Sequence, residues 1–358
     1  MNQYRIAVIP GDNIGPEVTN EGLRVLRELE SARVCGFEVE TFPWGARHVL
    51  KTGRAAPENL VELLAPFDAI YMGAHGDPAN VPDRFSSQQM MHPIRKGLDL
   101  YANVRPVKWW AGTQIPLKQT DPIDFVMVRE NTEGEYSNTG GSVHAGTPDE
   151  VAMMTTVVTR RGAERIINYA FEVARKRNGK KYVHCVTKSN ALALVMVLWD
   201  NVFEEAAARY PDVRTTKAHV DATSMYMITR PSSFDVVVAT NLMGDILSDE
   251  ASAATGSIGL APSACVNPER RKPAMFEPIH GSAPDIAGKQ LANPTAAILA
   301  AAMMLDWLGE TESAKAIERS VGRVLEERRC VTPDLGGTAK TSEVTDAILA
   351  DLGLALRA

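Results

Sequence analysis

The chain has 358 residues, of which 45% are hydrophobic and 23% are charged, so it can build a sizeable core and is long enough for two domains. This disfavours a single small binding module. The formal net charge is −6 and no dense block of lysine and arginine occurs, which disfavours nucleic acid or a membrane surface as a partner.

Residues 5–9 predict a buried strand, closed by the turn at 10–13 and followed by a helix. The same alternation continues along the chain, with helical stretches between most of the strand-like runs. Further short strands are predicted at 67–73, 124–128, 182–186 and 234–239. This order is typical of an α/β fold with a largely parallel sheet.

Two stretches depart from that pattern. The segment from Tyr136 to Thr156 is rich in Gly, Ser and Thr and then turns apolar, which fits a protruding hairpin that pairs with another chain. The nucleotide motifs G-x-G-x-x-G and Walker A are both missing, as are H-E-x-x-H and G-x-S-x-G. A dinucleotide would therefore have to bind outside the usual Rossmann geometry.

The cysteines and the N-terminus indicate the compartment. The four cysteines are scattered and form no C-x-x-C pair, so neither a zinc site nor a disulfide framework is expected. The apolar run at residues 6–9 is too short for a signal peptide, and no segment approaches the roughly 20 apolar residues of a membrane span. We expect a cytoplasmic protein.

A pair of carboxylates follows the strand at 234–239. Asp245 and Asp249 are four residues apart, so on a helix they share one face at the carboxyl end of that strand, where open α/β sheets place their ligands. Two such carboxylates repel each other unless a cation lies between them, and oxygen ligands suit Mg²⁺ or Mn²⁺. A solvated helix face explains the pair equally well.

Lys188 and Asp221 also lie where strand-like runs change to helices. A lysine in such a place, close to a divalent cation, could act as a base. The alternative is a surface lysine at a helix start, which Ser189 and Asn190 would cap.

Three arginines, Arg95, Arg105 and Arg129, form a further group. Guanidinium groups bind carboxylates with two hydrogen bonds, so arginines that converge imply a substrate with at least one carboxylate. A salt bridge from Arg129 to Glu130 or Glu133 would explain that residue equally well.

The loop at residues 276–288 combines Gly, Ser and Pro with His280 and Asp285. Such a loop could contact an adenosine, with the acid accepting hydrogen bonds from the ribose hydroxyls. By composition alone it is a long loop and nothing more.

Together these segments closely resemble the isocitrate/isopropylmalate dehydrogenase family of β-decarboxylating dehydrogenases. The resemblance covers essentially the whole chain and rests on several motifs in one order. Those motifs are residues 10–12, 102–106, 129–136, 187–190, 241–249 and 280–285. Residues 135–141 and 332–338 look most like the branch of the family that oxidises and decarboxylates tartrate and D-malate.

The resemblance implies a role for each site residue. It implies Tyr136 as the acid, Lys188 as the base, and a divalent metal, Mg²⁺ or Mn²⁺, bound by Asp221, Asp245 and Asp249. It places Arg95, Arg105 and Arg129 on the substrate carboxylates. For the dinucleotide it implies Glu277, His280, Gly281, Ser282, Ala283, Asp285, Ile286 and Asn293.

The resemblance also implies an assembly. It predicts a mixed, largely parallel sheet in two domains, with residues 1–100 and 257–358 binding NAD and residues 101–256 carrying the dimer interface and an arm at about 136–158. The active site would be shared across a homodimer, with Lys188 and Asp221 coming from the partner subunit. A requirement for K⁺ is left open.

Some positions qualify the expected specificity. NADP-linked members usually have Lys-Tyr where this chain has Asp285-Ile286, and an aspartate would repel a 2′-phosphate, so NAD is expected. Asn13 replaces a usual glycine but tolerates a left-handed conformation. The turn at residues 74–77 also departs from the usual glycine-rich one, which affects contacts near the nicotinamide.

Substrate choice is expected to depend on the residues before Arg95. Isocitrate enzymes usually have Ser and Asn where this chain has Gln89 and Met91, which disfavours a third substrate carboxylate. A small 2-hydroxy dicarboxylic acid such as tartrate or D-malate is therefore expected, with 3-isopropylmalate next. A silent regulatory subunit would lose ligands that this chain keeps, and a phosphohydrolase would leave the arginines unexplained.

Overall fold

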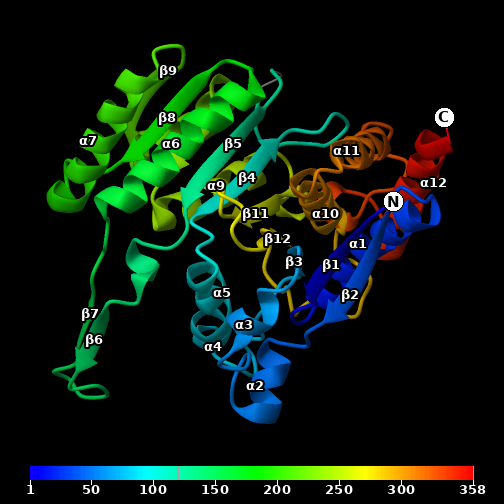
Figure 1. Cartoon of the computed structure of the whole chain (residues 1–358), viewed down its shortest axis with the longest axis horizontal. Coiled ribbons are helices and arrows are strands. Elements are labelled where there is room, and N and C mark those ends of the chain that lie inside the picture. Colours follow the sequence, from blue (N-terminus) through cyan, green and yellow to red (C-terminus); the bar gives the residue numbers. More distant parts are fainter. Residues whose placement is uncertain (119–120, 358) are drawn as a thin grey trace. The chain divides into compact units, whose positions relative to one another are not determined.

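The computed structural model describes residues 1–118 and 121–357, and its contacts divide the chain into two compact units. Unit 1 comprises Met1–Leu100, Lys108–Thr120 and Ser252–Ala358, and unit 2 comprises Tyr101–Val107 and Asp121–Ala251. These bounds differ from the domain bounds predicted above at residues 108–120 and 252–256. Both units combine strands with helices, so the predicted α/β class is confirmed (Figure 1).

Unit 1 contains five strands in the order β2-β1-β3-β12-β11. All neighbouring pairs are parallel except β11 and β12. The strands are β1 (Asn2–Ile9), β2 (Cys35–Thr41), β3 (Ala69–Met72), β11 (Pro262–Val266) and β12 (Ala274–Pro278). The helices are α1 (Gly15–Ser31), α2 (Ala46–Thr52), α3 (Leu60–Leu64), α4 (Arg84–Ser86), α5 (His92–Gly97), α10 (Thr295–Leu308), α11 (Thr311–Glu326) and α12 (Thr341–Arg357).

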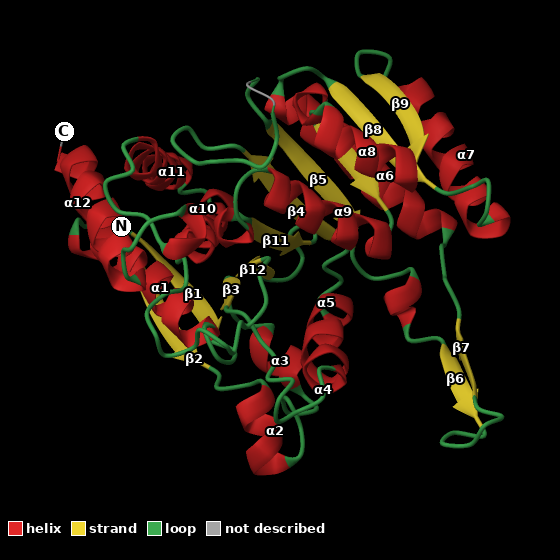
Figure 2. Ribbon diagram, turned by 180° about the vertical axis from the view of Figure 1, so that it is seen from behind, coloured by secondary structure: helices red, strands yellow, loops and turns green. Residues whose placement is uncertain are grey.

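The core of unit 1 follows from its apolar runs. The second half of β1, residues 6–9, is fully buried, as expected for a parallel strand covered on both faces. The alanine-rich helix α10 is buried along nearly its whole length and contacts α1, α11 and β12 (Figure 2). Small side chains let this helix approach its neighbours closely, which explains the run of alanines.

The first loop of unit 1 depends on two unusual backbone conformations. Gly11 has φ +78°, and a Cβ there would lie 2.0 Å from the carbonyl oxygen of Ala74. Asn13 has φ +51°, so the expectation that it adopts a left-handed conformation is confirmed. Its side-chain amide donates to the carbonyl of Gly76 at 2.9 Å, which ties the first loop to the turn at residues 74–77.

A π-helical turn, Ser87–Met91, separates α4 from α5. It buries Met90 and Met91, and it coincides with the segment that is expected to select the substrate. Such turns are rare and frequently occur at functional sites.

Unit 2 contains the strands β4, β5, β10, β8 and β9 in that spatial order. Pairs β5–β10, β10–β8 and β8–β9 are parallel. The strands are β4 (Ala102–Lys108), β5 (Asp124–Glu130), β8 (Tyr182–Thr187), β9 (Arg214–His219) and β10 (Val236–Ala239). The helices are α6 (Arg160–Arg177), α7 (Ala193–Arg209), α8 (Val220–Thr229) and α9 (Asn241–Ala254).

The predicted hairpin is a two-stranded antiparallel ribbon of β6 (Gly140–Val143) and β7 (Val151–Met154). It extends away from the other strands of unit 2 in both views (Figures 1 and 2). All eight of its strand residues are exposed, including Val143, Met153 and Met154. Its pairing with another chain stays a prediction. Among the residues described, no helix is both long and apolar enough to cross a membrane.

Candidate active site

Most of the predicted site residues of unit 2 lie at or just after the carboxyl ends of parallel strands, whereas Arg105 lies in the middle of β4. Arg129 is the penultimate residue of β5, and α9 begins at Asn241, two residues after the neighbouring strand β10. This edge is where open α/β sheets bind ligands, because the strand-to-helix loops converge there.

The guanidinium of Arg129 is buried and tightly held. Its Nε and Nη2 atoms both donate to Oδ1 of Asn241, at 2.9 and 2.7 Å, and Nη1 donates to Asp245. The side chain is only 2% exposed. Glu130 and Glu133 bond instead to Thr132 and Thr159 and to nearby backbone amides, so the alternative of a salt bridge to either glutamate is wrong.

Arg105 on β4 is held in a similar way. Its Nε donates to Oδ1 of Asn103 at 2.9 Å, and Nη1 donates to Oγ of Ser248 at 2.6 Å. Nη1 also lies 3.2 Å from Asp245 and 3.4 Å from Asp249. Both arginines therefore combine neutral oxygen acceptors with the carboxylate of Asp245, and Arg105 also contacts Asp249.

Tyr136 joins this group from the short 3-10 turn Glu135–Ser137. Its hydroxyl donates to Oδ2 of Asp245 at 3.1 Å, and the Arg129 guanidinium lies 5.6 Å from the centre of its ring. A tyrosine hydroxyl beside two guanidiniums and two carboxylates could donate a proton to a bound anion.

Asp245 and Asp249 share one face of α9, as their spacing predicts. Burial raises the pKa of Asp249, and the neighbouring Asp245 carboxylate adds to this shift, against the opposing effect of Arg105. The pair has the oxygen chemistry that a hard divalent cation prefers, and a cation would relieve the repulsion between the two carboxylates. These residues fit two of the ligands of such an ion.

Asp221 does not join this pair. It lies in the first turn of α8, where its Oδ1 accepts from Nζ of Lys188 at 2.9 Å, and this contact holds the pKa of Asp221 below its usual range. Across the described part of the single chain, no three His, Cys, Asp or Glu side chains form a metal-binding group. Asp221 and Lys188 thus form a separate pair, and the predicted third metal ligand would have to come from elsewhere.

Unit 1 brings together two more predicted residues. Nη2 of Arg95, on α5, donates to Oε1 of Glu277 on β12 at 3.0 Å, and both side chains are nearly buried. Arg95 was assigned to the substrate and Glu277 to the dinucleotide, so this contact joins the predicted substrate and dinucleotide residues within unit 1.

The loop after β12 supplies the rest of the predicted dinucleotide site. His280 is buried, burial lowers its pKa, and its Nε2 has no hydrogen-bond partner among the residues that the structure describes. Ala283 has φ +40°, and Ile286 packs against the buried cluster of Ile14, Val18, Ala292 and Ala297. A buried nitrogen without a partner is costly, so a bound ligand that supplies one fits this position.

The remaining loop residues differ in how free they are. Asp285 is exposed, and its carboxylate has no partner among the residues that the structure describes. A Cβ on Gly281 would meet nothing within 4 Å. The carbonyl of Ser282 accepts from the amide of Ile14 at 3.0 Å. The amide of Asn293 is already engaged at both ends, donating to Asp334 and accepting from the backbone of Thr295.

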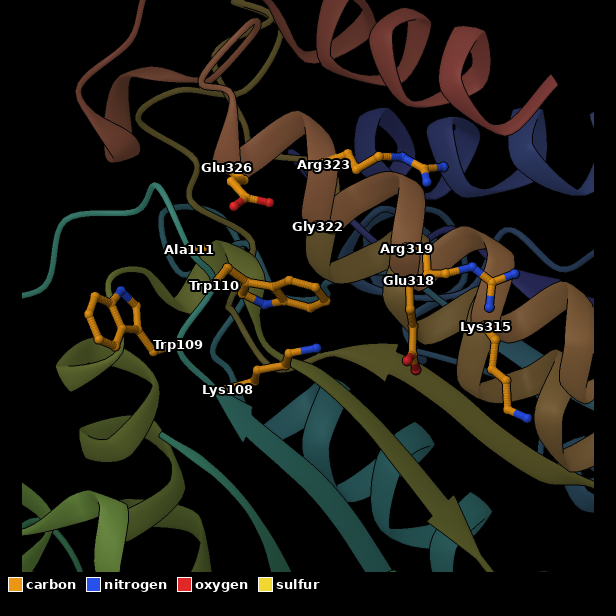
Figure 3. Close-up of a pocket in the computed structure, with 10 residues that line it drawn as sticks. All are labelled: Lys108, Trp109, Trp110, Ala111, Lys315, Glu318, Arg319, Gly322, Arg323 and Glu326. Carbon is orange, nitrogen blue, oxygen red and sulfur yellow. The ribbon is translucent and has the colours of Figure 1, made fainter. Parts of the chain in front are cut away.

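One large hollow lies elsewhere in unit 1. It measures about 500 Å³ and is bounded by α11 and residues 108–111, and none of the predicted site residues lines it (Figure 3). Two of its cations are engaged: Lys108 lies 4.0 Å from the centre of the Trp110 ring, and Arg323 pairs with Asp351 at 2.5 Å. Size alone therefore does not identify the reactive site of this chain.

The sequence reasoning missed the neutral residues that hold the arginines. Asn103 lies in the motif at residues 102–106, and Asn241 and Ser248 lie in the motif at 241–249, but no role was predicted for any of them. Each accepts a hydrogen bond from a buried guanidinium. Two signals were available: Asn103 stands two residues from Arg105 on one strand face, and Ser248 stands on the helix that carries both carboxylates.

Comparisons with known proteins identify the family of this chain. A model of the isocitrate/isopropylmalate dehydrogenase family matches residues 5–348. A probable tartrate dehydrogenase/decarboxylase of Agrobacterium vitis is 49% identical over 97% of each chain, and a decarboxylating D-malate dehydrogenase of Escherichia coli K12 is 47% identical over 97% of this chain and 98% of its own. The crystal structure of an isocitrate dehydrogenase from Methylococcus capsulatus has a TM-score of 0.88 at 37% identity, covering 98% of this chain and 99% of that one. The chain belongs to the isocitrate/isopropylmalate dehydrogenase family.

Proposed function

We propose that this protein oxidises and then decarboxylates a small 2-hydroxy dicarboxylic acid such as D-malate or tartrate, with NAD and a divalent cation. The observation that carries the proposal is the group formed by Arg105, Arg129, Tyr136, Asp245 and Asp249, in which the two buried arginines and the tyrosine hydroxyl contact the carboxylates of α9. The names of the relatives, a tartrate dehydrogenase/decarboxylase and a D-malate dehydrogenase, support the same chemistry.

The two buried arginines bind the substrate. Each guanidinium keeps a fixed orientation because a side-chain amide oxygen accepts from its Nε, and fixed guanidinium groups bind carboxylates with two hydrogen bonds. Arg95 of unit 1 is the third arginine assigned to the substrate. A dicarboxylate is the class of ligand that such a set recognises.

Asp245 and Asp249 hold the divalent cation, with Asp221 of a second subunit as the third ligand. When bound, the cation supplies positive charge that stabilises the oxygen on which negative charge develops, and NAD supplies the hydride acceptor. NAD is expected over NADP because the exposed carboxylate of Asp285 can accept from ribose hydroxyls and repels a 2′-phosphate.

Two residues move protons. Lys188 accepts the proton of the substrate hydroxyl as the hydride leaves the same carbon. The resulting β-keto acid loses carbon dioxide, and Tyr136 donates its hydroxyl proton to the carbon that the carboxylate has left. Because Lys188 and Asp221 pair with each other and not with Asp245, we propose that they serve the site of a partner subunit in a homodimer.

The segment before Arg95 favours a small substrate. Oε1 of Gln89 accepts from the backbone amide of Ala55 at 3.0 Å, and Met91 is buried. Neither residue supports a third substrate carboxylate, so isocitrate is disfavoured.

The test compares kcat/KM for D-malate, tartrate, 3-isopropylmalate and isocitrate on one preparation, with NAD and with NADP. We expect the C4 acids with NAD to give the highest values. A preference for 3-isopropylmalate would revise the substrate. Absence of NADH formation with every one of these acids, in the presence of Mg²⁺ or Mn²⁺, would overturn the proposal.

A further inference from the structure

A second hollow lies in unit 2, on β8, β9 and the end of α8. It measures about 440 Å³, within the range of small-molecule sites. Its lining includes Arg214, Lys217 and Arg230, together with Tyr182 and Tyr226. Of the described residues that line it, none is Asp or Glu. The chain has 44 acidic and 38 basic residues, so a lining with three cations and no carboxylate differs in sign from the net charge of the chain.

The charges of this hollow are unequally compensated. Lys217 is paired, with its Nζ 2.6 Å from Glu204 and 3.2 Å from Asp200. Arg214 and Arg230 are both exposed, and neither forms an ion pair within the residues for which the structure gives side chains. Two positive charges therefore remain available at the hollow.

Both arginines are held against aromatic rings. The guanidinium carbon of Arg230 lies 3.7 Å from the centre of the Tyr226 ring, and that of Arg214 lies 5.7 Å from the centre of the Tyr182 ring. Stacking on a ring restricts a guanidinium while its N–H groups stay free to donate at the edge. The arginines are thus positioned without being neutralised.

The hollow is also lined by a buried histidine and by hydroxyl groups that hydrogen-bond with one another. His184 is buried, with Nδ1 2.8 Å from Oγ1 of Thr216 and Nε2 2.9 Å from Oγ1 of Thr223. Burial, with a smaller contribution from Arg230, lowers the pKa of His184 to about 4, so the imidazole is neutral at neutral pH. The hydroxyl of Tyr182 lies 2.5 Å from Oγ1 of Thr216, which adds hydroxyl groups at the same place.

We propose that this hollow binds a small polyanion that carries phosphate or carboxylate groups. Guanidinium groups bind both kinds of oxyanion with paired hydrogen bonds, and two arginines from different elements suit a ligand with at least two anionic groups. The inference does not depend on the dehydrogenase activity proposed above, because it uses none of the residues assigned to that activity.

The test measures binding of pyrophosphate, ATP and citrate to the full-length protein by isothermal titration calorimetry at low and at physiological ionic strength. The three probes distinguish a phosphate from a nucleotide and from a tricarboxylate. We expect saturable binding of at least one probe. Arg214→Gln and Arg230→Gln should each weaken it about tenfold, and the double variant about a hundredfold.

Two variants serve as controls. Arg270→Gln removes an arginine that also lies over an aromatic ring, 4.2 Å from the centre of Trp307, but in unit 1. It should leave the affinity unchanged. Arg230→Lys keeps the charge and loses the planar donor pair, so it should fall between wild type and Arg230→Gln. Since both arginines of the hollow are exposed, all variants should keep the wild-type melting temperature.

Three outcomes would overturn the proposal. The first is no saturable binding of any probe up to about 10 mM, the weak end of specific affinities. The second is binding that the double variant leaves unchanged, which would place the probe at the dinucleotide or substrate residues. The third is an Arg270→Gln variant that weakens probe binding as much as the variants of the hollow, which would show that the affinity depends only on the net charge of the protein.

Discussion

Replacing Asn241 tests how the substrate arginine is held. Its Oδ1 accepts two hydrogen bonds from Arg129, whose side chain is 2% exposed. Asn241→Ala removes this acceptor from a buried guanidinium, and hydrogen bonds to charged groups contribute about 1.5–3 kcal/mol each. For a bond of about 2.2 kcal/mol, KM rises about sixfold if half of its energy is lost from substrate binding and about fortyfold if all of it is lost.

Asn241→Asp separates positioning from charge. The carboxylate keeps an acceptor near Nε of Arg129 but neutralises the guanidinium, so we expect KM for D-malate to rise at least as much as in Asn241→Ala. A purely structural role predicts the opposite, a nearly normal KM in the isosteric variant. The assay is steady-state kinetics with KM and kcat determined separately, together with the melting temperature of each variant.

The matched control is Asn168→Asp, because Oδ1 of Asn168 also accepts from an arginine, Arg209, at 3.0 Å, but on the surface of unit 2. This variant should keep the wild-type KM. Unchanged KM in both Asn241 variants of an active enzyme would refute the reasoning.

The remaining predictions concern the acid, the metal and the stability. Tyr136→Phe should lose most pyruvate formation from D-malate, measured by a coupled assay; unchanged formation would rule out Tyr136 as the acid. Activity should disappear in chelator and return with Mg²⁺ or Mn²⁺, and activity that survives complete removal of divalent ions would exclude the metal. His184 has a pKa of 6.5 in the unfolded chain and of about 4 in the folded chain. Between these values the unfolded chain binds more protons, so the stabilisation present above pH 6.5 is lost as pH falls toward 4. Urea titrations at several pH values should show that the free energy of unfolding falls by up to about 3 kcal/mol more in wild type than in His184→Gln between pH 6.5 and 4. An equal decrease in both proteins would contradict this account.

Much of the fold could be predicted because parallel strands are buried on both faces. The apolar runs at residues 67–73, 182–186 and 234–239 correspond to β3, β8 and β10, and their burial is nearly complete. The edge strand β9, Arg214–His219, was visible only as the strand-like run before Asp221, because its sequence is polar on both faces. A strand that is half exposed at a sheet edge does not need the continuous apolar run that marks a central one.

The site was predictable in its charged residues and not in its neutral ones. Carboxylates and arginines stand out in a sequence because burying an unpaired charge is costly. A charged residue at the end of an apolar strand therefore indicates a partner or a ligand. Asn103, Asn241 and Ser248 carry no such signal, since amides and hydroxyls occur everywhere on a surface. The sequence positions of Asn103 and Ser248 make them candidates, but the distances to Arg105 and Arg129 are needed to assign a role to them and to Asn241.

The separation of the Lys188–Asp221 pair from the Asp245–Asp249 pair has a consequence for mixtures of chains. If each active site draws on two subunits, a chain without Lys188 and a chain without Arg129 are each inactive alone, yet a hybrid of the two contains one intact set of residues. Co-expression of the two inactive variants would then restore growth on the substrate. Subunit exchange between two related chains could likewise be detected as a return of enzyme activity.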